Sequence, residues 1–204
     1  MPEVIFNGPE GRLEGRYSHG KTENAPIALV LHPHPQHGGT MNNKFVYNLY
    51  HSFVQRGFST LRFNFRGVGQ SEGEFDDGEG EVQDVLSMLA WVSEHWPDLP
   101  LILGGYSFGA AMALIAAARE QTDQTKEVSK LILVAPPIQM MESDDALSID
   151  TCVILGARDT IVSASAAAQY FGEDQIIVLP QADHFFAGSQ KELTHHIREF
   201  LNGA

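Results

Sequence analysis

Short apolar runs alternate with longer segments of helical periodicity from about residue 27 to the end of the chain. Each of six short runs is nearly continuous in its apolar character, which is typical of strands that are covered on both faces. Strands that alternate with helices build a parallel sheet with helices on both of its faces. The pattern therefore predicts an α/β fold with a mostly parallel sheet, whose strands are expected at residues 27–32, 59–65, 101–106, 130–135, 151–156 and 175–180.

Turn and capping residues mark the ends of the other elements. Two alternating stretches flank a turn cluster at residues 7–11, which predicts an N-terminal antiparallel hairpin at the edge of the sheet. Gly57 and Pro97 are expected to end the helices that precede them. Ser189 and Glu192 have the spacing of a capping box, so we expect the last helix to begin there.

The composition narrows the class of protein. A chain of 204 residues, 43% hydrophobic and 19% charged, is expected to form one domain over residues 1–204. Its formal net charge of -13 would repel nucleic acid and anionic membranes, so neither is expected as a partner. We find no signal-peptide pattern and no apolar run near the roughly 18 residues of a membrane span. With Cys152 as the single cysteine, we expect a soluble, cytoplasmic protein without internal disulfides, and its oligomeric state stays open.

The sharpest chemical signal is the stretch LILGGYSFGAAMALIAAA, where Gly105, Ser107 and Gly109 match the pattern G-x-S-x-G. An apolar strand precedes this pattern and an alanine-rich helix follows it, as a nucleophile elbow requires. Small residues at both glycine positions let the strand and the helix approach closely, so that the turn presents the serine hydroxyl above the sheet. We therefore predict that Ser107 is a catalytic nucleophile.

A nucleophilic serine needs a base and an acid that orients the base, and after such a turn they follow in the order Ser, Asp/Glu, His. His184 lies between the last strand and the last helix, whereas His195 and His196 lie inside that helix. Asp159 follows a strand, as the acid should, although a turn or helix-capping role is its alternative. Asp183 is adjacent to His184, and neighbouring side chains diverge. We expect His184 to be the base and Asp159 the acid.

Three histidines, His32, His34 and His37, follow the first parallel strand in LHPHPQHGG. Imidazole binds zinc, and alternate residues of an extended chain share a face, so these side chains could form a metal site. Such a site needs further ligands, and the serine turn beside it would then have no catalytic function. The other reading is that the histidines shape a loop that serves the serine, and on this reading no metal is expected.

From residue 27 to residue 184 the motifs of the chain resemble, in their order, those of small, lidless members of the α/β-hydrolase superfamily. The segments LHPHP, FNFRGVGQSEG, GYSFG, LGARDTIV and DHF match the motifs of the oxyanion loop, the loop after the next strand, the nucleophile, the acid and the base. Where many relatives insert a helical lid, this chain has only about fifteen residues, 136–150. The chain is similar in size and plan to dienelactone-hydrolase-like proteins.

Three positions qualify this resemblance. Ser107 stands where dienelactone hydrolases use cysteine, and Cys152 precedes a strand and cannot replace it. Asn64 stands where relatives often have aspartate, so the hydrogen bonds of its loop cannot be carried over. Arg66, in the same motif, is expected to stabilise the loop as a donor rather than to bind substrate.

The resemblance implies a serine hydrolase, carboxylesterase- or thioesterase-like, that cleaves an ester, thioester or related acyl bond of a small-molecule substrate without a cofactor. Ser107 would attack, His184 would carry the proton and Asp159 would orient the imidazole. The superfamily's oxyanion hole consists of two backbone N–H groups, which implies those of His34 and Phe108, with Gly38 or Gly39 as alternatives to His34. Two alternatives stay open, a non-catalytic interaction protein with this fold and a metal-dependent hydrolase that uses the three histidines.

Overall fold

The computed structural model describes residues 3–123, 126–141 and 149–202, without the side chains of residues 121–123. In these ranges it has eight strands: Glu3–Gly8 (β1), Gly11–Ser18 (β2), Ile27–Leu31 (β3), Ser59–Phe63 (β4), Leu101–Tyr106 (β5), Val128–Val134 (β6), Asp150–Gly156 (β7) and Ile176–Leu179 (β8). The same ranges hold five α-helices: Lys44–Arg56 (α1), Glu79–His95 (α2), Phe108–Asp123 (α3), Ala164–Phe171 (α4) and Gln190–Leu201 (α5). Three short 3₁₀ segments are Pro35–His37 (η1), Ile138–Met140 (η2) and Glu173–Gln175 (η3).

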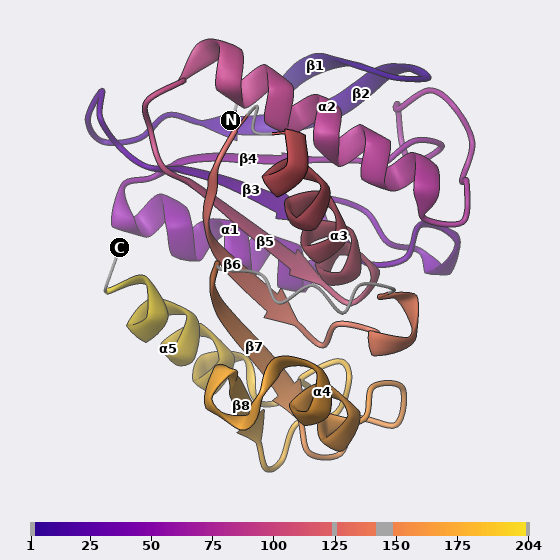
Figure 1. Cartoon of the computed structure of the whole chain (residues 1–204), viewed down its shortest axis with the longest axis vertical. Helices are drawn as coiled ribbons and strands as arrows, with labels where there is room; N and C mark the ends of the chain where they lie inside the picture. Colours follow the sequence, from indigo (N-terminus) through magenta and orange to yellow (C-terminus); the bar gives the residue numbers. More distant parts are fainter. Residues whose placement is uncertain (1–2, 124–125, 142–148, 203–204) are drawn as a thin grey trace.

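All eight described strands belong to one sheet, in the order β1-β2-β4-β3-β5-β6-β7-β8. β1 pairs antiparallel with β2, β2 pairs antiparallel with β4, and the strands from β4 to β8 are parallel. Figure 1 shows the sheet running from the β1–β2 hairpin at the top of the view to β8 at the bottom. The expected mostly parallel sheet and the edge hairpin are therefore confirmed.

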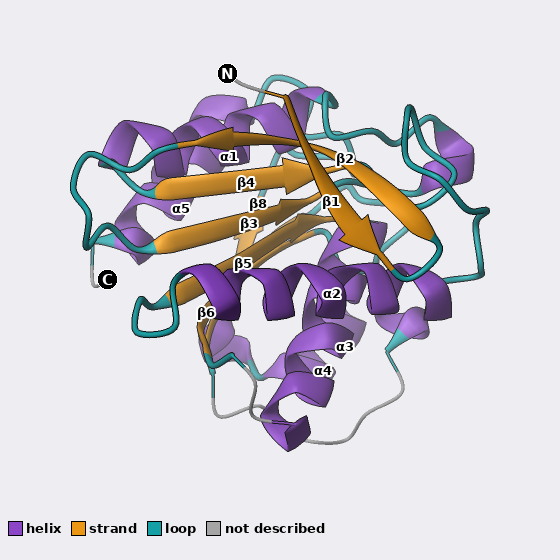
Figure 2. Ribbon diagram, turned by 90° about the horizontal axis from the view of Figure 1, so that it is seen from above, coloured by secondary structure: helices purple, strands orange, loops and turns teal. Residues whose placement is uncertain are grey.

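Helices cover both faces of the sheet because its strands are apolar on both sides. Figure 2 shows α1 and α5 on one side of the sheet and α2, α3 and α4 on the other. The apolar side chains form two cores, one on each face. Leu49 and Phe53 of α1 enter one core, and Val85 and Leu89 of α2 enter the other. Such a sandwich leaves the carboxyl edge of the sheet open for functional loops.

The expected helix ends are present, with one error. Gly57 ends α1 in a left-handed conformation with φ of 92°. Ser189 stands directly before α5, but its side chain makes no capping hydrogen bond, so the predicted capping box is wrong. The backbone of Ser189 has φ of -101° and ψ of 11° because its N–H closes a turn onto the Phe186 carbonyl, and a capping side chain needs extended backbone.

No lid covers the carboxyl edge among the described residues between β6 and β7, where η2 is the only helical segment. Residues 142–148 of this connection lie outside the described part of the chain. No helix of the described part is long and apolar enough to span a membrane.

Candidate active site

The turn between β5 and α3 has the backbone strain and the close contacts of a nucleophile elbow. Ser107 has φ of 53°, in the left-handed region that residues other than glycine rarely adopt. A Cβ atom on Gly105 would lie 2.3 Å from the carbonyl oxygen of Gly109, and one on Gly109 would lie 2.5 Å from that of His32. Neither position has room for a side chain, so the turn has the close approach that the sequence pattern predicts.

The structure brings Ser107, His184 and Asp159 together from three separate loops. Ser107 Oγ lies 3.0 Å from His184 Nε2, and His184 Nδ1 lies 2.8 Å from Asp159 Oδ2. The Asp159 side chain is fully covered and that of His184 is 7% exposed. Because a carboxylate accepts hydrogen bonds, the imidazole proton belongs on Nδ1, and Nε2 can accept the serine hydrogen. The three residues chosen from the sequence thus have the geometry of nucleophile, base and orienting acid.

The Asp159 carboxylate also closes the turn that follows it. Its Oδ1 atom accepts hydrogen bonds from the N–H groups of Ile161 (2.7 Å) and Val162 (2.8 Å). The turn role, which the sequence offered as an alternative, therefore occurs together with the contact to the imidazole. Three N–H donors hold this carboxylate and fix its orientation.

The other acid and histidine candidates lie elsewhere. Asp183 Oδ1 accepts from the N–H groups of Phe185 (3.0 Å) and Ala187 (3.2 Å), so its carboxylate shapes its own turn. His195 and His196 lie on α5 with their ring centroids 5.4 Å apart. None of these side chains competes for the position beside the serine.

Tyr106 also contacts the site, although the sequence did not predict it. Its phenol donates a hydrogen bond to the carbonyl oxygen of His184 at 2.9 Å, and the two rings lie 5.6 Å apart. Burial raises the pKa of this phenol, which therefore stays protonated and able to donate. The contact ties β5 to a loop 78 residues away. No sequence signal marks it, because G-x-S-x-G leaves this position free.

The two residues whose N–H groups are expected to hold an oxyanion line the pocket that contains the serine. His34 and Phe108 line the same pocket as Ser107, and their rings are 5.0 Å apart. Phe108 is the first residue of α3, where backbone N–H groups have no acceptor within the helix. In the described part of the chain, no hydrogen bond uses the N–H of either residue. Both groups are therefore available to a ligand in the pocket.

His32, the first histidine of LHPHPQHGG, is part of the scaffold. It is completely buried, its Nδ1–H donates to the Pro33 carbonyl (2.7 Å), and its Nε2 accepts from the Phe65 N–H (3.0 Å). Burial lowers its pKa to about 4, so the ring is neutral at ordinary pH. With both nitrogens engaged, this ring joins the loop after β3 to the loop after β4.

This role of His32 weakens the metal alternative. His34 also has one ring nitrogen engaged, since its Nδ1 accepts from the Gln36 N–H at 3.2 Å. Throughout the residues that the structure describes, no group of three or more His, Cys, Asp or Glu side chains could hold a metal ion. The alternative with His32, His34 and His37 as ligands therefore has no geometric support.

A pocket of about 540 Å³ surrounds the serine. The imidazoles of His34 and His37, with centroids 4.5 Å apart, belong to its lining on the side of the β3 loop. Phe185, Ile161 and Met140 give it apolar walls from three other loops. The pocket thus has imidazoles on the side of the β3 loop and apolar side chains from the loops after β6, β7 and β8.

Buried polar contacts hold the loop that follows β4. Asn64 Oδ1 accepts from the Met41 N–H (2.8 Å), and its Nδ2 donates to Glu14 (2.9 Å). An amide can do both, whereas an aspartate would face the Glu14 carboxylate. Arg66 Nη2 lies 2.8 Å from Asp84 Oδ1, and both side chains are buried. Arg66 therefore stabilises the loop, as expected, and does not line the pocket.

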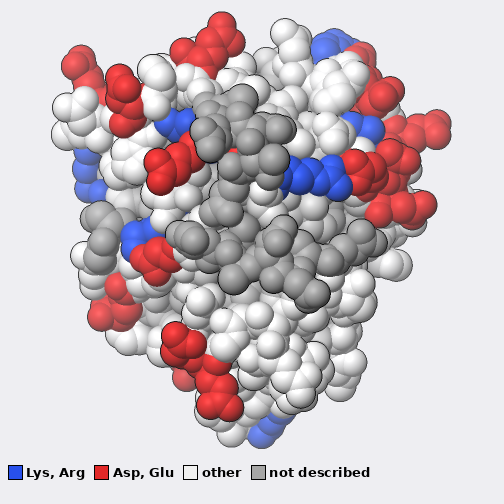
Figure 3. All heavy atoms as spheres, in the orientation of Figure 1, with Lys and Arg blue, Asp and Glu red and all other residues white. Residues whose placement is uncertain are grey.

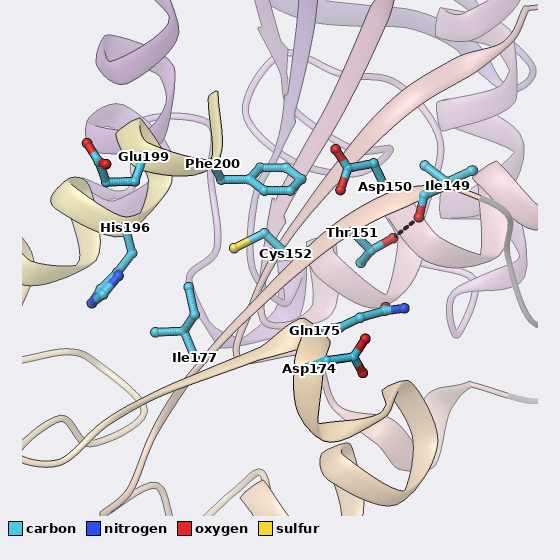
Figure 4. Close-up of a pocket in the computed structure, with 10 residues that line it drawn as sticks. All are labelled: Ile149, Asp150, Thr151, Cys152, Asp174, Gln175, Ile177, His196, Glu199 and Phe200. Carbon is cyan, nitrogen blue, oxygen red and sulfur yellow. Dashed lines mark hydrogen bonds between the residues drawn. The ribbon is translucent and has the colours of Figure 1, made fainter. Parts of the chain in front are cut away.

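A second pocket, of about 480 Å³, lies near the start of β7, at the opposite edge of the sheet. Figure 4 shows the Cys152 sulfur directed toward its middle, with the carboxylates of Asp150, Asp174 and Glu199 around it. Burial raises the pKa of the Cys152 thiol to about 12, so it stays protonated at neutral pH. This cysteine is remote from the serine and, as expected, does not replace it.

Residues 34–146 match the family Hydrolase_4, described as serine aminopeptidase, S33. The uncharacterized protein RP471 of Rickettsia prowazekii (strain Madrid E) is 40% identical over 217 aligned positions, which cover 98% of this chain and 89% of that protein.

Two solved structures are similar over nearly their whole length. An α/β serine hydrolase homologue from Coxiella burnetii is 35% identical with a TM-score of 0.86, covering 97% of this chain and 96% of that one. XC6422 from Xanthomonas campestris, an α/β serine hydrolase without lid, is 31% identical with a TM-score of 0.87, covering 98% and 93%.

Proposed function

The chain belongs to the Hydrolase_4 family of α/β hydrolases, and from this membership we propose that it is a serine hydrolase that cleaves an ester, thioester or related acyl bond of a small substrate. The observation that carries the proposal is the hydrogen-bonded chain from Ser107 through His184 to Asp159. Its distances of 3.0 Å and 2.8 Å are within the range required for proton transfer and for orientation of the base.

In the proposed reaction Ser107 Oγ attacks the acyl carbon while His184 Nε2 takes the serine proton. The N–H groups of His34 and Phe108 stabilise the negative charge on the carbonyl oxygen. The bond to the leaving group then breaks, its heteroatom takes the proton from Nε2, and the serine is left acylated. Water attacks the acyl-enzyme, gives a proton to His184 and releases the acid, after which the proton returns to the serine. Asp159 stabilises the imidazolium in both steps.

The distribution of charge bears on the substrate class and the setting. On the face shown in Figure 3, acidic side chains are spread widely and most basic ones lie beside acidic ones. Arg119 and Glu79 form one such ion pair of the surface. A net charge of -13 disfavours the approach of polyanions. We therefore propose small neutral acyl substrates, and a cytoplasmic enzyme, since the single cysteine is buried and unpaired.

The test is covalent labelling of the serine. A fluorophosphonate should label the folded protein at Ser107, and Ser107→Ala should lose both labelling and hydrolysis of a panel of acyl esters and thioesters. Ser165→Ala, a serine on α4, is the matched control and should label as the wild type does. A folded wild type that is not labelled and cleaves no member of the panel would leave the non-catalytic alternative in place.

A further inference from the structure

Phe185 exposes a large apolar side chain directly beside the proposed base. It is 60% exposed, although aromatic side chains are usually largely buried. Its ring lies 5.5 Å from that of His184 at an interplanar angle of 87°, and it lines the pocket over Ser107. An exposed aromatic ring at this place marks a surface that a ligand can cover.

The backbone of the loop after β8 holds this ring outward. The Asp183 carboxylate accepts the N–H groups of Phe185 (3.0 Å) and Ala187 (3.2 Å), which closes a tight turn. Phe186 has φ of 47°, a strained conformation for a residue with a side chain, and is completely buried beside Phe45. Because the turn sends Phe186 into the core, it leaves Phe185 at the pocket.

The loop after β7 repeats this arrangement with the other acid. Asp159 Oδ1 accepts the N–H groups of Ile161 and Val162 at 2.7 Å and 2.8 Å. Val162 is 2% exposed and enters the core, whereas Ile161 is 53% exposed and lines the pocket. Two aspartate-closed turns therefore each present one apolar side chain, Ile161 and Phe185, on the side of the pocket where the acid and the base are placed.

The direction of proton transfer decides which part of a substrate meets these side chains. The leaving oxygen of an ester must lie near His184 Nε2, because that atom returns the proton when the C–O bond breaks. The carbonyl oxygen must instead point to the N–H groups of His34 and Phe108. The group attached to the leaving oxygen therefore extends past His184 toward the exposed ring next to it.

We infer that Phe185 and Ile161 form a subsite for an apolar leaving group, so that the preferred substrates are esters of alcohols with an aromatic or branched alkyl group. This inference rests on the proposed serine hydrolase function. Covering part of a phenyl ring on this surface should change kcat/KM about fivefold, which corresponds to about 1 kcal/mol and is less than full burial of such a ring would give.

Two isomeric esters test the subsite. Benzyl acetate carries its ring on the leaving alcohol, and methyl phenylacetate carries the same ring on the acyl group. The kcat/KM for benzyl acetate divided by that for methyl phenylacetate should fall about fivefold in Phe185→Ala, because the variant has less apolar surface for the leaving group to cover. In Ile161→Ala the same ratio should fall about twofold, since isoleucine has a smaller apolar side chain than phenylalanine. Ile5→Ala is the matched control, since Ile5 is 50% exposed on β1 and does not line the pocket, and it should keep the wild-type ratio.

The outcomes separate this inference from the proposed function. A ratio that is unchanged or higher in Phe185→Ala overturns the subsite, and a higher ratio would assign this wall to the acyl group. A wild type that is labelled at Ser107 but cleaves neither isomer also overturns the subsite, while the serine hydrolase function stands. A folded wild type with neither labelling nor hydrolysis refutes the proposed function itself.

Discussion

His32 should make the folded protein sensitive to mild acid. In the folded state its Nε2 must accept the Phe65 N–H, at 3.0 Å, and burial lowers its pKa to about 4. Protonation would turn Nε2 into a donor that faces the Phe65 N–H, which is also a donor, in a site that water does not reach. In the unfolded chain the same ring has a pKa of about 6.5, so protons bind the unfolded state more tightly. The free energy of unfolding therefore decreases as the pH decreases.

The size of the effect follows from the two pKa values. The difference between about 6.5 unfolded and about 4 folded corresponds to about 3 kcal/mol of unfolding free energy. This contribution is present at neutral pH and is lost progressively as the pH falls from about 6.5 to about 4. At about pH 5, about 2 kcal/mol should already be lost, a large share of the stability of an ordinary domain.

The assay compares wild type with His32→Asn, whose amide retains a donor and an acceptor but does not titrate. Urea titrations at about pH 7 and about pH 5, followed by tryptophan fluorescence, give the unfolding free energy at each pH. Between about pH 7 and about pH 5, the unfolding free energy of the wild type should decrease by about 2 kcal/mol more than that of the variant. His37→Asn, which removes an exposed ring from the same loop, should behave as the wild type does. Equal losses in wild type and His32→Asn would refute the reasoning.

Four further outcomes are expected. Tyr106→Phe removes the donor to the His184 carbonyl, so kcat for an acyl ester should fall about threefold to tenfold with little change in KM; an unchanged kcat would contradict a positioning role. Asn64→Asp should lower the unfolding free energy in urea at neutral pH by about 1–3 kcal/mol, because its carboxylate would face that of Glu14. Hydrolysis should persist after exhaustive chelation and in His37→Ala, whereas recovery that depends on added zinc would revive the metal alternative. Across p-nitrophenyl esters from acetate to palmitate, kcat/KM should favour short acyl groups, because an open pocket of about 540 Å³ leaves a long chain in water; a steady rise through the longest soluble chains would argue otherwise.

The features that could be predicted are those that neighbouring residues determine. The apolar runs indicate the strands because each must fill both faces of the sheet, and Gly105 and Gly109 indicate the tight turn because no larger residue fits there. The order of serine, acid and base then selects Asp159 and His184 from several candidates. These predictions needed no knowledge of which loops meet in space.

The features that escaped prediction depend on contacts between distant segments. The bond from Tyr106 to His184 joins residues 78 positions apart, and nothing in the sequence near His32 indicates that the Phe65 N–H would meet its ring. The capping box at Ser189 failed for a local reason, because the turn closed by its N–H onto the Phe186 carbonyl fixes its backbone. Local patterns give the propensity of a segment, and tertiary contacts decide how its polar groups are used.

The double use of the Asp159 carboxylate restricts how this enzyme can diversify. One oxygen of Asp159 orients the His184 imidazole, while the other closes the turn that carries Ile161. An insertion or deletion in this loop would therefore move the acid together with the apolar side chain that lines the pocket. Exchange of the side chain at position 161 leaves the two hydrogen bonds of the turn in place, because they use the backbone N–H groups of residues 161 and 162. Adaptation of the substrate range, in nature or in a laboratory library, should therefore proceed by substitution at Ile161 and Phe185 and tolerate almost no change in the length of either turn.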